Sequence, residues 1–378
     1  MTNVLLLYEI LNPSVRLCAY EQLNFLYKLG KIEFKHSSFR NVTQEECVES
    51  DVVILVRSDS DMALQLVKTL KKRDKYIVYV LDDDILDIAD GLVSSKYYKS
   101  VSVQKRIKKI MTYCDMLLSP SELLLQKYKG YFHTSAIIEE PALGEKRKST
   151  HSKNLIKIGF AGSIDRKADV ESILTNTIHE IVNKYKDKVE FEFFGAKPDI
   201  VDELNLKYYP YTENYELYQK KLGELNWDIG LAPMPNTNFH QCKHYNKYIE
   251  YSAHGIIGIY SNIMPYTKII KNGVNGILCN NVTQEWTKAI SYLIDNEIVR
   301  NELLDNIENI KKEKFSLEIV SKQYMDAVPE LLTYTSHNRK RLPLNVIKLR
   351  YDIIRIINFI CRNKLKTPVR LFQKITNN

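Results

Sequence analysis

The fold is decided by the stretch WDIGLAPMPNTNFHQCKHYNKYIEYSAHGIIGIYSN (227–262), which contains a strand, a loop, a helix, a glycine turn and a second strand in that order. On a helix that starts at Lys243, the side chains of Lys243, Lys247 and Glu250 fall within about 60° of one another, since each residue advances by about 100°. Tyrosine and aliphatic side chains occupy the opposite side. The helix is therefore expected to pack by its apolar side and to present two ammonium groups and one carboxylate.

This polar stripe has two interpretations. A helix N-terminus together with Lys243 and Lys247 suits a diphosphate, and the carboxylate of Glu250 can accept hydrogen bonds from both ribose hydroxyls. In the alternative, Lys247 and Glu250 form an ion pair on a solvated helix face, which stabilises a helix by roughly a few tenths of a kcal/mol.

Strand and helix patterns alternate on both sides of this stretch. Runs such as VVILV (52–56) and YIVYVL (76–81) are apolar throughout, as expected for strands buried on both faces of a parallel sheet. The pattern predicts an α/β chain with two Rossmann-like, doubly wound domains, and two facing sheet edges would form one shared site. Strands are expected at 3–10, 31–35, 51–56, 76–81, 115–118 and 135–138, and in the second half at 156–161, 189–194, 227–231, 256–260 and 276–279.

Composition shifts predict the domain boundaries. The polar, highly charged segment GEKRKSTHSKN (144–154) separates the two strand-helix patterns and is typical of a linker. Two long helical stretches end the second pattern before the basic tail. The predicted organisation is a first domain at 1–145, a linker at 146–155, a second domain at 156–332 and a basic amphipathic tail at 338–378.

Charge and cysteine content exclude several function classes. The tail 338–378 contains 11 Lys and Arg residues and one acidic residue, so it accounts for more than the net charge of +8 of the 378-residue chain. The body is slightly acidic, and no nucleic acid is expected as a partner. The six cysteines show no metal-binding spacing, the start has no leader pattern, and no apolar run approaches the ~20 residues that span a bilayer. A reduced, cytoplasmic setting is expected.

The tail is predicted to form a helix over 344–363. Its stripe of Lys348, Asp352 and Arg355 faces a broad apolar surface. One interpretation is a helix at the inner face of an anionic membrane, whose basic residues reach lipid headgroups. The other is a terminal helix that packs on the N-terminal domain.

Five motifs of the second half follow one another along the chain: IGFAGS (158–163), DIGLAP (228–233), FHQCK (239–243), KYIEYSAHG (247–255) and KNGVNGIL (271–278). In this order and spacing they resemble the C-terminal domain of GT-B glycosyltransferases of the family 4-like (glycosyltransferase group 1) type. The resemblance implies a GT-B fold, with an N-terminal acceptor domain, a C-terminal nucleotide-sugar-binding domain and a C-terminal helical extension.

The resemblance implies roles for residues near the deciding helix. Glu250 matches the later glutamate of the family's E-x7-E signature and is implied to contact the donor ribose. Cys242 stands where the earlier glutamate would be, so that carboxylate is absent. Lys243 and Lys247 match basic positions in the subgroup that lacks it, which implies contact with the diphosphate.

The first strand of the second domain supplies the other implied contacts. Gly162 and Ser163 stand where the family's first strand meets the donor phosphates, although a plain strand-to-loop turn would also use Gly162. Arg166, with Lys167, approximates a basic pair that the family often has just beyond this point.

Three consecutive carboxylates, Asp82, Asp83 and Asp84, follow a buried strand in LDDDILD (81–87). Their mutual repulsion requires a metal, cationic partners or plain solvation. A D-x-D after a strand is also typical of GT-A glycosyltransferases, but that fold has no need of a second Rossmann-like half. Asp83 and Asp84 are predicted to face the cleft as catalytic residues, with a solvated turn or helix cap as the alternative. The histidines, including His244, show no pairing pattern and are predicted to be structural.

Together these features predict an enzyme that transfers a sugar from a nucleoside-diphosphate sugar to a glycan or lipid-linked acceptor. The resemblance implies a hexosyltransferase-like, retaining enzyme that uses no cofactor and requires no metal, and it suggests bacterial surface-polysaccharide synthesis. Two alternatives keep the same fold: a non-catalytic protein that binds a nucleotide or a partner, favoured by Cys242, and a nucleotide-sugar epimerase.

Overall fold

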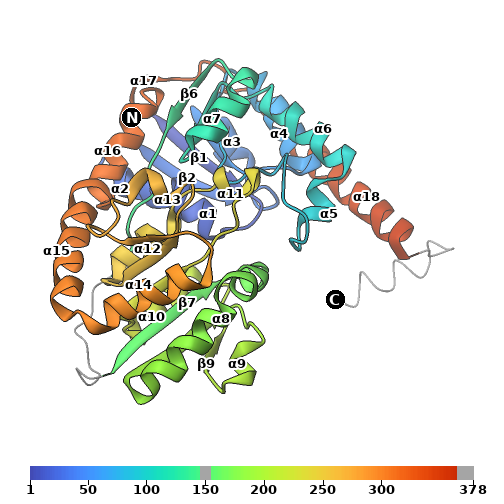
Figure 1. Cartoon of the computed structure of the whole chain (residues 1–378). Helices are drawn as coiled ribbons and strands as arrows, with labels where there is room; N and C mark the ends of the chain where they lie inside the picture. Colours follow the sequence, from blue (N-terminus) through green and yellow to red (C-terminus); the bar gives the residue numbers. More distant parts are fainter. Residues whose placement is uncertain (145–154, 364–378) are drawn as a thin grey trace.

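The computed structural model describes residues 1–144 and 155–363, in two lobes that each contain a six-stranded sheet (Figure 1). The predicted linker, apart from residue 155, and the last 15 residues of the tail lie outside the described residues. Among those described, no helix combines the length and the apolar content that a membrane span needs.

The first sheet is parallel throughout, in the order β2-β1-β3-β4-β5-β6. Its strands are β1 (Asn3–Tyr8), β2 (Glu33–Ser38), β3 (Val52–Val56), β4 (Tyr76–Val80), β5 (Met116–Ser119) and β6 (Thr134–Ile137). The helices around it are α1 (Pro13–Val15), η1 (Arg16–Tyr20), α2 (Glu21–Lys28), α3 (Gln44–Glu49), α4 (Asp61–Lys71), α5 (Ser95–Tyr98), α6 (Val101–Met111), α7 (Glu122–Tyr128) and η2 (Lys129–Tyr131).

The second sheet is also parallel, in the order β12-β11-β10-β7-β8-β9. Its edge strand β9 was not predicted, because it is short and only half-buried. The strands are β7 (Ile156–Gly162), β8 (Val189–Gly195), β9 (Lys207–Pro210), β10 (Ile229–Ala232), β11 (Ile257–Ser261) and β12 (Ile277–Cys279). The helices are η3 (Ile164–Arg166), α8 (Lys167–Tyr185), η4 (Lys186–Lys188), α9 (Ile200–Glu203), α10 (Tyr215–Leu225), α11 (Asn238–Gln241), α12 (Asn246–His254), α13 (Tyr266–Ile269), α14 (Thr283–Asp295), α15 (Glu297–Lys314), α16 (Leu317–Ala327), α17 (Glu330–Thr333) and α18 (Leu344–Asn363).

The last helices return to the first lobe. Helix α16 packs on α2, and Tyr324, Val328 and Leu331 are buried in the core beneath the first sheet. The stretch 317–332, which the sequence assigned to the second domain, therefore packs on the first. The two sheets are thus joined by this return as well as by the chain between them.

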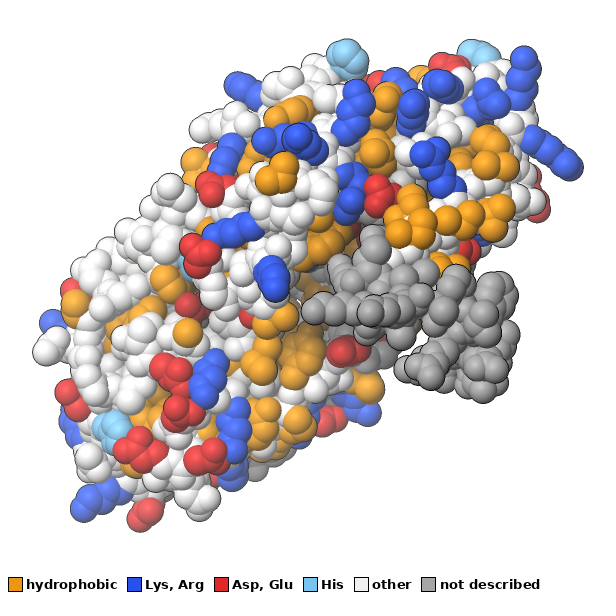
Figure 2. Space-filling view, turned by 90° about the vertical axis from the view of Figure 1, so that its right-hand side faces the viewer, with side chains coloured by type: hydrophobic (Ala, Val, Ile, Leu, Met, Phe, Trp, Pro, Cys, Tyr) orange, Lys and Arg blue, Asp and Glu red, His pale blue; other side chains and the backbone are white. Residues whose placement is uncertain are grey.

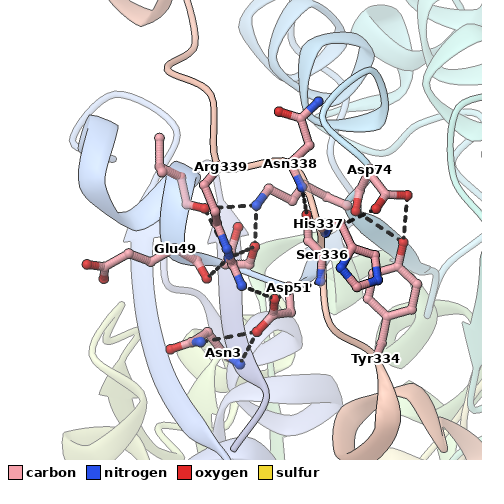
Figure 3. Close-up of polar contacts among 12 residues, drawn as sticks. Asn3, Glu49, Asp51, Asp74, Tyr334, Ser336, His337, Asn338 and Arg339 are labelled. Atoms are coloured by element: carbon pink, nitrogen blue, oxygen red, sulfur yellow. Dashed lines mark hydrogen bonds and ion pairs between the residues drawn. The ribbon is translucent and has the colours of Figure 1, made fainter.

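A strap of chain after α17 secures the return (Figure 3). Asp51, just before β3, accepts hydrogen bonds from the backbone N–H of Asn3 at 2.8 Å and of Ser336 at 2.9 Å. The oxygen that accepts from Ser336 also accepts from Arg339 Nη2 at 2.5 Å. The hydroxyl of Tyr334 donates to the Asp74 carboxylate at 3.1 Å. These contacts lie at the amino ends of the strands, away from the edge where ligands of such sheets bind.

The tail helix α18 shares features of both interpretations. Leu344 and Ile347 are buried in the first lobe's core, and α18 packs on α4. Beyond these turns the helix projects from the body (Figure 1), and apolar side chains such as Ile353 and Ile357 are exposed.

Candidate active site between the two sheets

A cavity of about 320 Å³ lies where the carboxyl ends of the two sheets face one another. The first lobe contributes α1 and the loop after β4, and the second contributes the loops after β7, β9 and β10 together with α12. This is the position at which open α/β sheets bind ligands. The predicted residues that line it are Asp83, Gly162, Ser163, Arg166, Lys243, Lys247 and Glu250.

Lys243 reaches this cavity from a loop, so the prediction that it lies on the helix is wrong. Helix α12 begins at Asn246, and Tyr245 has a non-helical ψ of 42°. The cause lies in the other lobe, because the Tyr245 hydroxyl donates to Glu139 at 2.7 Å and Cys242 is buried in the first lobe's core. Lys243 Nζ then lies 2.6 Å from Asp83 Oδ1, an ion pair across the cleft.

The other two members of the predicted stripe do lie on α12. Lys247 and Glu250 form an ion pair, and Lys247 also donates to the Tyr218 hydroxyl at 3.2 Å. The pair exists as the alternative interpretation expected, but it lines the cavity, and the Glu250 side chain is only 14% exposed. A ligand hydroxyl can therefore reach this carboxylate, which Lys247 holds in place.

The three aspartates are separated by the turn after β4. The Asp83 carboxylate accepts a hydrogen bond from Arg57 Nη1 at 2.8 Å in addition to the one from Lys243. Burial opposes ionisation of Asp83, but the two cations outweigh it and lower its pKa. Arg57 itself has a positive φ of 45°, a conformation that is strained for a non-glycine residue and is often found at functional sites. Cationic partners therefore explain the first part of the acidic run.

Asp84 points away from the cavity, which corrects its predicted position. It is buried, accepts from Lys127 Nζ at 2.6 Å and from the Tyr128 hydroxyl, and accepts the backbone N–H of Asp87 at 3.2 Å. The tight turn directs its side chain toward α7. Instead, Asp82 lines the cavity, 3.4 Å from Arg57 Nε.

The backbone is closely packed at the end of β7. The Gly162 carbonyl accepts the Ala196 N–H at 2.8 Å, and a Cβ on Gly162 would lie 2.9 Å from the Phe160 ring. Ser163 is exposed at the start of η3, which leads directly into α8. Arg166 lines the same cavity, with its guanidinium oriented by the Pro233 carbonyl at 2.6 Å. Backbone N–H groups at such a helix start, beside an arginine, attract anions.

A buried acid–histidine cluster was not predicted from the sequence. His244 lines the cavity, with Nε2 3.3 Å from Glu139 and Nδ1 3.8 Å from Glu140. Burial lowers the pKa of His244, but these carboxylates outweigh it and raise the pKa overall. Burial also raises the pKa of Glu140 to about 7. Glu139 and Glu140 lie near the end of the last strand of the first sheet, with one residue between them and β6, but nothing in the sequence pairs them with His244.

Aromatic side chains form the remaining wall. Tyr215 and Tyr218 stack at 6.3 Å between ring centroids, and Phe194 stacks on Tyr218 at 4.8 Å. Tyr211, after β9, also lines the cavity. Arg16, from the first lobe, lies at this end of the cleft and forms an ion pair of 2.9 Å with Glu216.

Comparison with solved structures identifies the arrangement of the two sheets. HepE of Anabaena, in complex with UDP and glucose, aligns with a TM-score of 0.61 at 11% identity, covering 87% of this chain and all of HepE. A glycosyltransferase from Rickettsia africae aligns with a TM-score of 0.61 at 13% identity, over 88% of this chain and 99% of the other. The lipopolysaccharide outer core galactosyltransferase WaaB aligns with a TM-score of 0.56 at 12% identity, over 87% and 99%.

At this level of identity the likeness establishes the fold alone. No protein-family model matches the chain, and neither does any curated protein. The matches cover both lobes of this chain and nearly the whole of each of these three structures. The chain therefore has the GT-B fold of glycosyltransferases, with two Rossmann-like sheets that face one another across a cleft and helices that follow the second sheet.

Proposed function

We propose that this chain is a glycosyltransferase that takes a sugar from a nucleoside-diphosphate donor. The observation that carries the proposal is the cavity itself, in which a helix start, the three cations Arg166, Lys243 and Lys247 and the Glu250 carboxylate converge at facing sheet edges. The backbone at Gly162 and Ser163, with Arg166 and Lys243, binds the diphosphate. Glu250 accepts the ribose hydroxyls. Structures of HepE contain UDP and UDP-glucose, which are therefore the first ligands to test.

The aromatic wall suits the base of the donor. Tyr211 is half-exposed at the cavity, next to the stacked pair of Tyr215 and Tyr218. A planar base gains dispersion and stacking energy against such rings. The diphosphate, ribose and base would then lie in sequence from the end of β7 to the loop after β9.

Transfer requires little covalent chemistry from the protein. The acceptor hydroxyl oxygen forms a bond to the anomeric carbon while that carbon's bond to the diphosphate oxygen breaks, and the hydroxyl proton leaves with the nucleoside diphosphate. Negative charge develops on the leaving diphosphate, where Arg166 and Lys243 stabilise it. Asp83 positions Lys243 through their 2.6 Å ion pair.

The donor assignment is tested by nucleotide binding and turnover together. Binding of UDP and a panel of other nucleoside diphosphates is measured by calorimetry, and consumption of the matching nucleotide sugars is measured with and without a bacterial lipid extract. We expect Glu250→Ala to weaken nucleotide binding at least about tenfold, because a charge-assisted hydrogen bond to each hydroxyl is lost. Glu224→Ala, an exposed change on α10, is the matched control.

The other functions of this fold give different results in the same experiment. Nucleotide binding without consumption of any nucleotide sugar would contradict the enzyme assignment and favour a binding protein. A new nucleotide sugar formed in the absence of acceptor would favour an epimerase. Cys242 stands where the resemblance implies a glutamate, so this position supplies no carboxylate. Its side chain is buried in the first lobe's core.

We further propose that the acceptor is presented at an anionic membrane surface, with the enzyme on its cytoplasmic face. Val346, Leu349, Ile353, Ile356 and Ile357 are exposed on α18 and lie within about 100° of one another around the helix axis. This apolar stripe lies on the opposite side of α18 from Leu344 and Ile347, which are buried where the helix packs on the first lobe. An amphipathic helix of this kind binds bilayer interfaces, and nearby lysines add attraction to anionic lipids.

The neighbouring helices supply that positive charge. Helix α4 packs between α18 and α6, and Figure 2 shows Lys and Arg side chains around exposed hydrophobic groups on this side of the molecule. A second copy of the chain would need a complementary apolar or acidic face, whereas an anionic bilayer complements both features. The exposed lysines on α4 and α6 are Lys68, Lys71, Lys72, Lys105, Lys108 and Lys109.

Vesicle flotation tests this membrane assignment. We expect the full chain to bind vesicles of phosphatidylcholine with phosphatidylglycerol, and to bind phosphatidylcholine alone weakly. Leu349→Glu with Ile353→Glu should abolish binding, while Ile298→Glu, an equally exposed change on α15, should not. No flotation, or a dimer in sedimentation that the α18 variant abolishes, would contradict the membrane assignment.

A further inference from the structure

A second cavity, of about 250 Å³, lies at the carboxyl ends of β1 and β3 in the first lobe. Asn12 and Val15 line it from one side of α1, whereas Pro13 and Ser14 line the main cavity from the other. The two cavities are therefore neighbours separated by one turn of chain. Helix α5 forms the outer wall of the second cavity.

Two carboxylates that the donor site does not use face this second cavity. One carboxylate oxygen of Glu9, Oε1, is buried and has no hydrogen-bond partner among the described residues. Burial, together with the charge of Asp59, raises the pKa of Glu9. Asp59 is only 8% exposed, and burial raises its pKa as well. A buried acceptor without a donor is costly, so a ligand that brings hydroxyl groups would be stabilised here.

The aromatic wall of this cavity is held in place before any ligand binds. The rings of Tyr97 and Tyr98 meet edge to face at 5.1 Å, and the Tyr97 hydroxyl donates to Asp59 Oδ1 at 3.2 Å. Arg106 fixes this arrangement from α6, with Nη2 donating to the Tyr97 hydroxyl at 3.3 Å and Nε donating to the Asp59 carbonyl. Apolar ring surface beside hydrogen-bonding groups is the usual construction of a small-molecule site.

The remaining charged group connects the cavity with the donor site. Arg57 lines the second cavity, but its guanidinium is already paired with Asp83 at 2.8 Å and with Asp82 at 3.4 Å. The cavity therefore offers two carboxylates and no uncompensated cation from its own lining, which disfavours an anionic ligand. A ligand bound here would be one residue away from the Asp83–Lys243 ion pair.

We propose that this cavity is an acceptor subsite that binds one uncharged sugar ring, with hydroxyl groups donating to Glu9 and Asp59 and the ring resting against Tyr97 and Tyr98. The assignment rests on the proposed glycosyltransferase function and names the chemistry of its acceptor. The subsite is also on the flank of the tail helix, since α5 packs on α6, α6 on α4 and α4 on α18. An acceptor sugar on a lipid anchor would approach from that flank.

Ligand-detected NMR on the full chain with saturating UDP tests the subsite. The probes are methyl glycosides of glucose, galactose and N-acetylglucosamine, with methyl glucuronide as the anionic counterpart. We expect a neutral glycoside to bind and the glucuronide to bind at least about tenfold more weakly. Glu9→Gln and Asp59→Asn should each weaken the neutral probe by about tenfold, because a charge-assisted hydrogen bond is lost. Glu45→Gln, an exposed change of the same kind, is the control.

The same samples separate the two proposals. UDP affinity should stay within about twofold in both variants, since neither residue lines the donor cavity. If the unaltered chain did not bind UDP, the proposed donor site itself would be contradicted. Two results would overturn the subsite alone while UDP binding stays intact. In one, the unaltered chain binds no neutral glycoside. In the other, the Glu9 and Asp59 variants bind the neutral glycoside as tightly as the unaltered chain does. Tyr98→Phe, which keeps the ring, should retain most of the affinity and excludes a folding defect.

Discussion

The two walls of the cleft differ in charge and in construction. The second lobe presents a helix start and the cations Arg166, Lys243 and Lys247, from loops and a helix that follow its strands directly. The first lobe presents carboxylates from the ends of several strands, among them Asp83 and Glu139. Opposite charges therefore meet across the cleft, as expected if the proposed donor diphosphate lies on the second lobe and the proposed acceptor hydroxyl groups lie on the first.

The largest expected effect comes from Lys243, a cation of the second wall that pairs with the first. Lys243→Ala removes the proposed diphosphate contact and leaves Asp83 with a single cationic partner. We expect kcat/KM for transfer to fall about a hundredfold or more, the size typical of losing one electrostatic contact to a developing charge. Steady-state kinetics measure this. Lys220→Ala, an exposed lysine on α10, is the control, and a loss below about threefold would place the diphosphate elsewhere.

Adjacent aspartates on the first wall should separate function from stability. Asp84→Ala removes the partner of Lys127 and Tyr128 in a buried network, which should cost about 2–3 kcal/mol in free energy of unfolding. Its nucleotide affinity should stay unchanged. Asp83→Asn should do the reverse, lowering turnover with a smaller stability loss. Urea unfolding and calorimetric UDP titration distinguish them, and equal effects of the two variants on turnover would refute the division.

The same contrast explains what the sequence could predict. The second wall comes from two short segments, 158–166 and 227–262, whose motifs carry the family resemblance. That resemblance, and not the helical pattern alone, implied roles for Arg166, Lys247 and Glu250, which line the cavity. The first wall depends on strand order, which brings Arg57, Asp83 and Glu139 together from three separate strands. Periodicity cannot show that pairing.

The placement of Lys243 failed for a related reason. A helical period continues through 243–245, but contacts to Glu139 in the other lobe stop the helix from starting there. Tertiary contacts override local propensity in this way. Likewise, the pairing of His244 could be seen only once the two lobes were in contact.

A third test concerns the pH dependence of the contact between the walls. The raised pKa of His244 stabilises the folded form fully below its ordinary value near 6.5, and that contribution is lost as pH rises through the raised value. Glu140 has a pKa near 7 instead of its ordinary 4.5, so the stability that it contributes to the folded chain is lost as pH rises between these two values. The lowered pKa of Glu139 acts oppositely, with its contribution lost in acid below its ordinary value.

Stability should therefore decline from about pH 5 to pH 8, by an amount on the order of 3 kcal/mol. Thermal unfolding at constant ionic strength measures it. His244→Gln removes the imidazole, whose charge holds the pKa of Glu140 down, so the His244 contribution should disappear and the decline due to Glu140 should extend to higher pH. His133→Gln, on the surface of the first lobe, should leave the profile unchanged. A His244→Gln profile identical to that of the unaltered chain would show that the buried pair does not titrate in this range.

The smallest expected effect is at the open end of the cleft. Arg16 pairs with Glu216 at 2.9 Å, but Glu216 is 71% exposed, so solvent and salt screen the attraction. Arg16 also pairs with Glu21 at 2.7 Å within its own lobe, so a single change at Arg16 removes two contacts. A double-mutant cycle with Arg16→Ala and Glu216→Ala isolates the pair across the cleft and should give about 0.2–1 kcal/mol. A coupling above about 2 kcal/mol would mean that this exposed pair, and not the half-buried Asp83–Lys243 pair or the Glu139–His244 pair, contributes most to the contact between the walls.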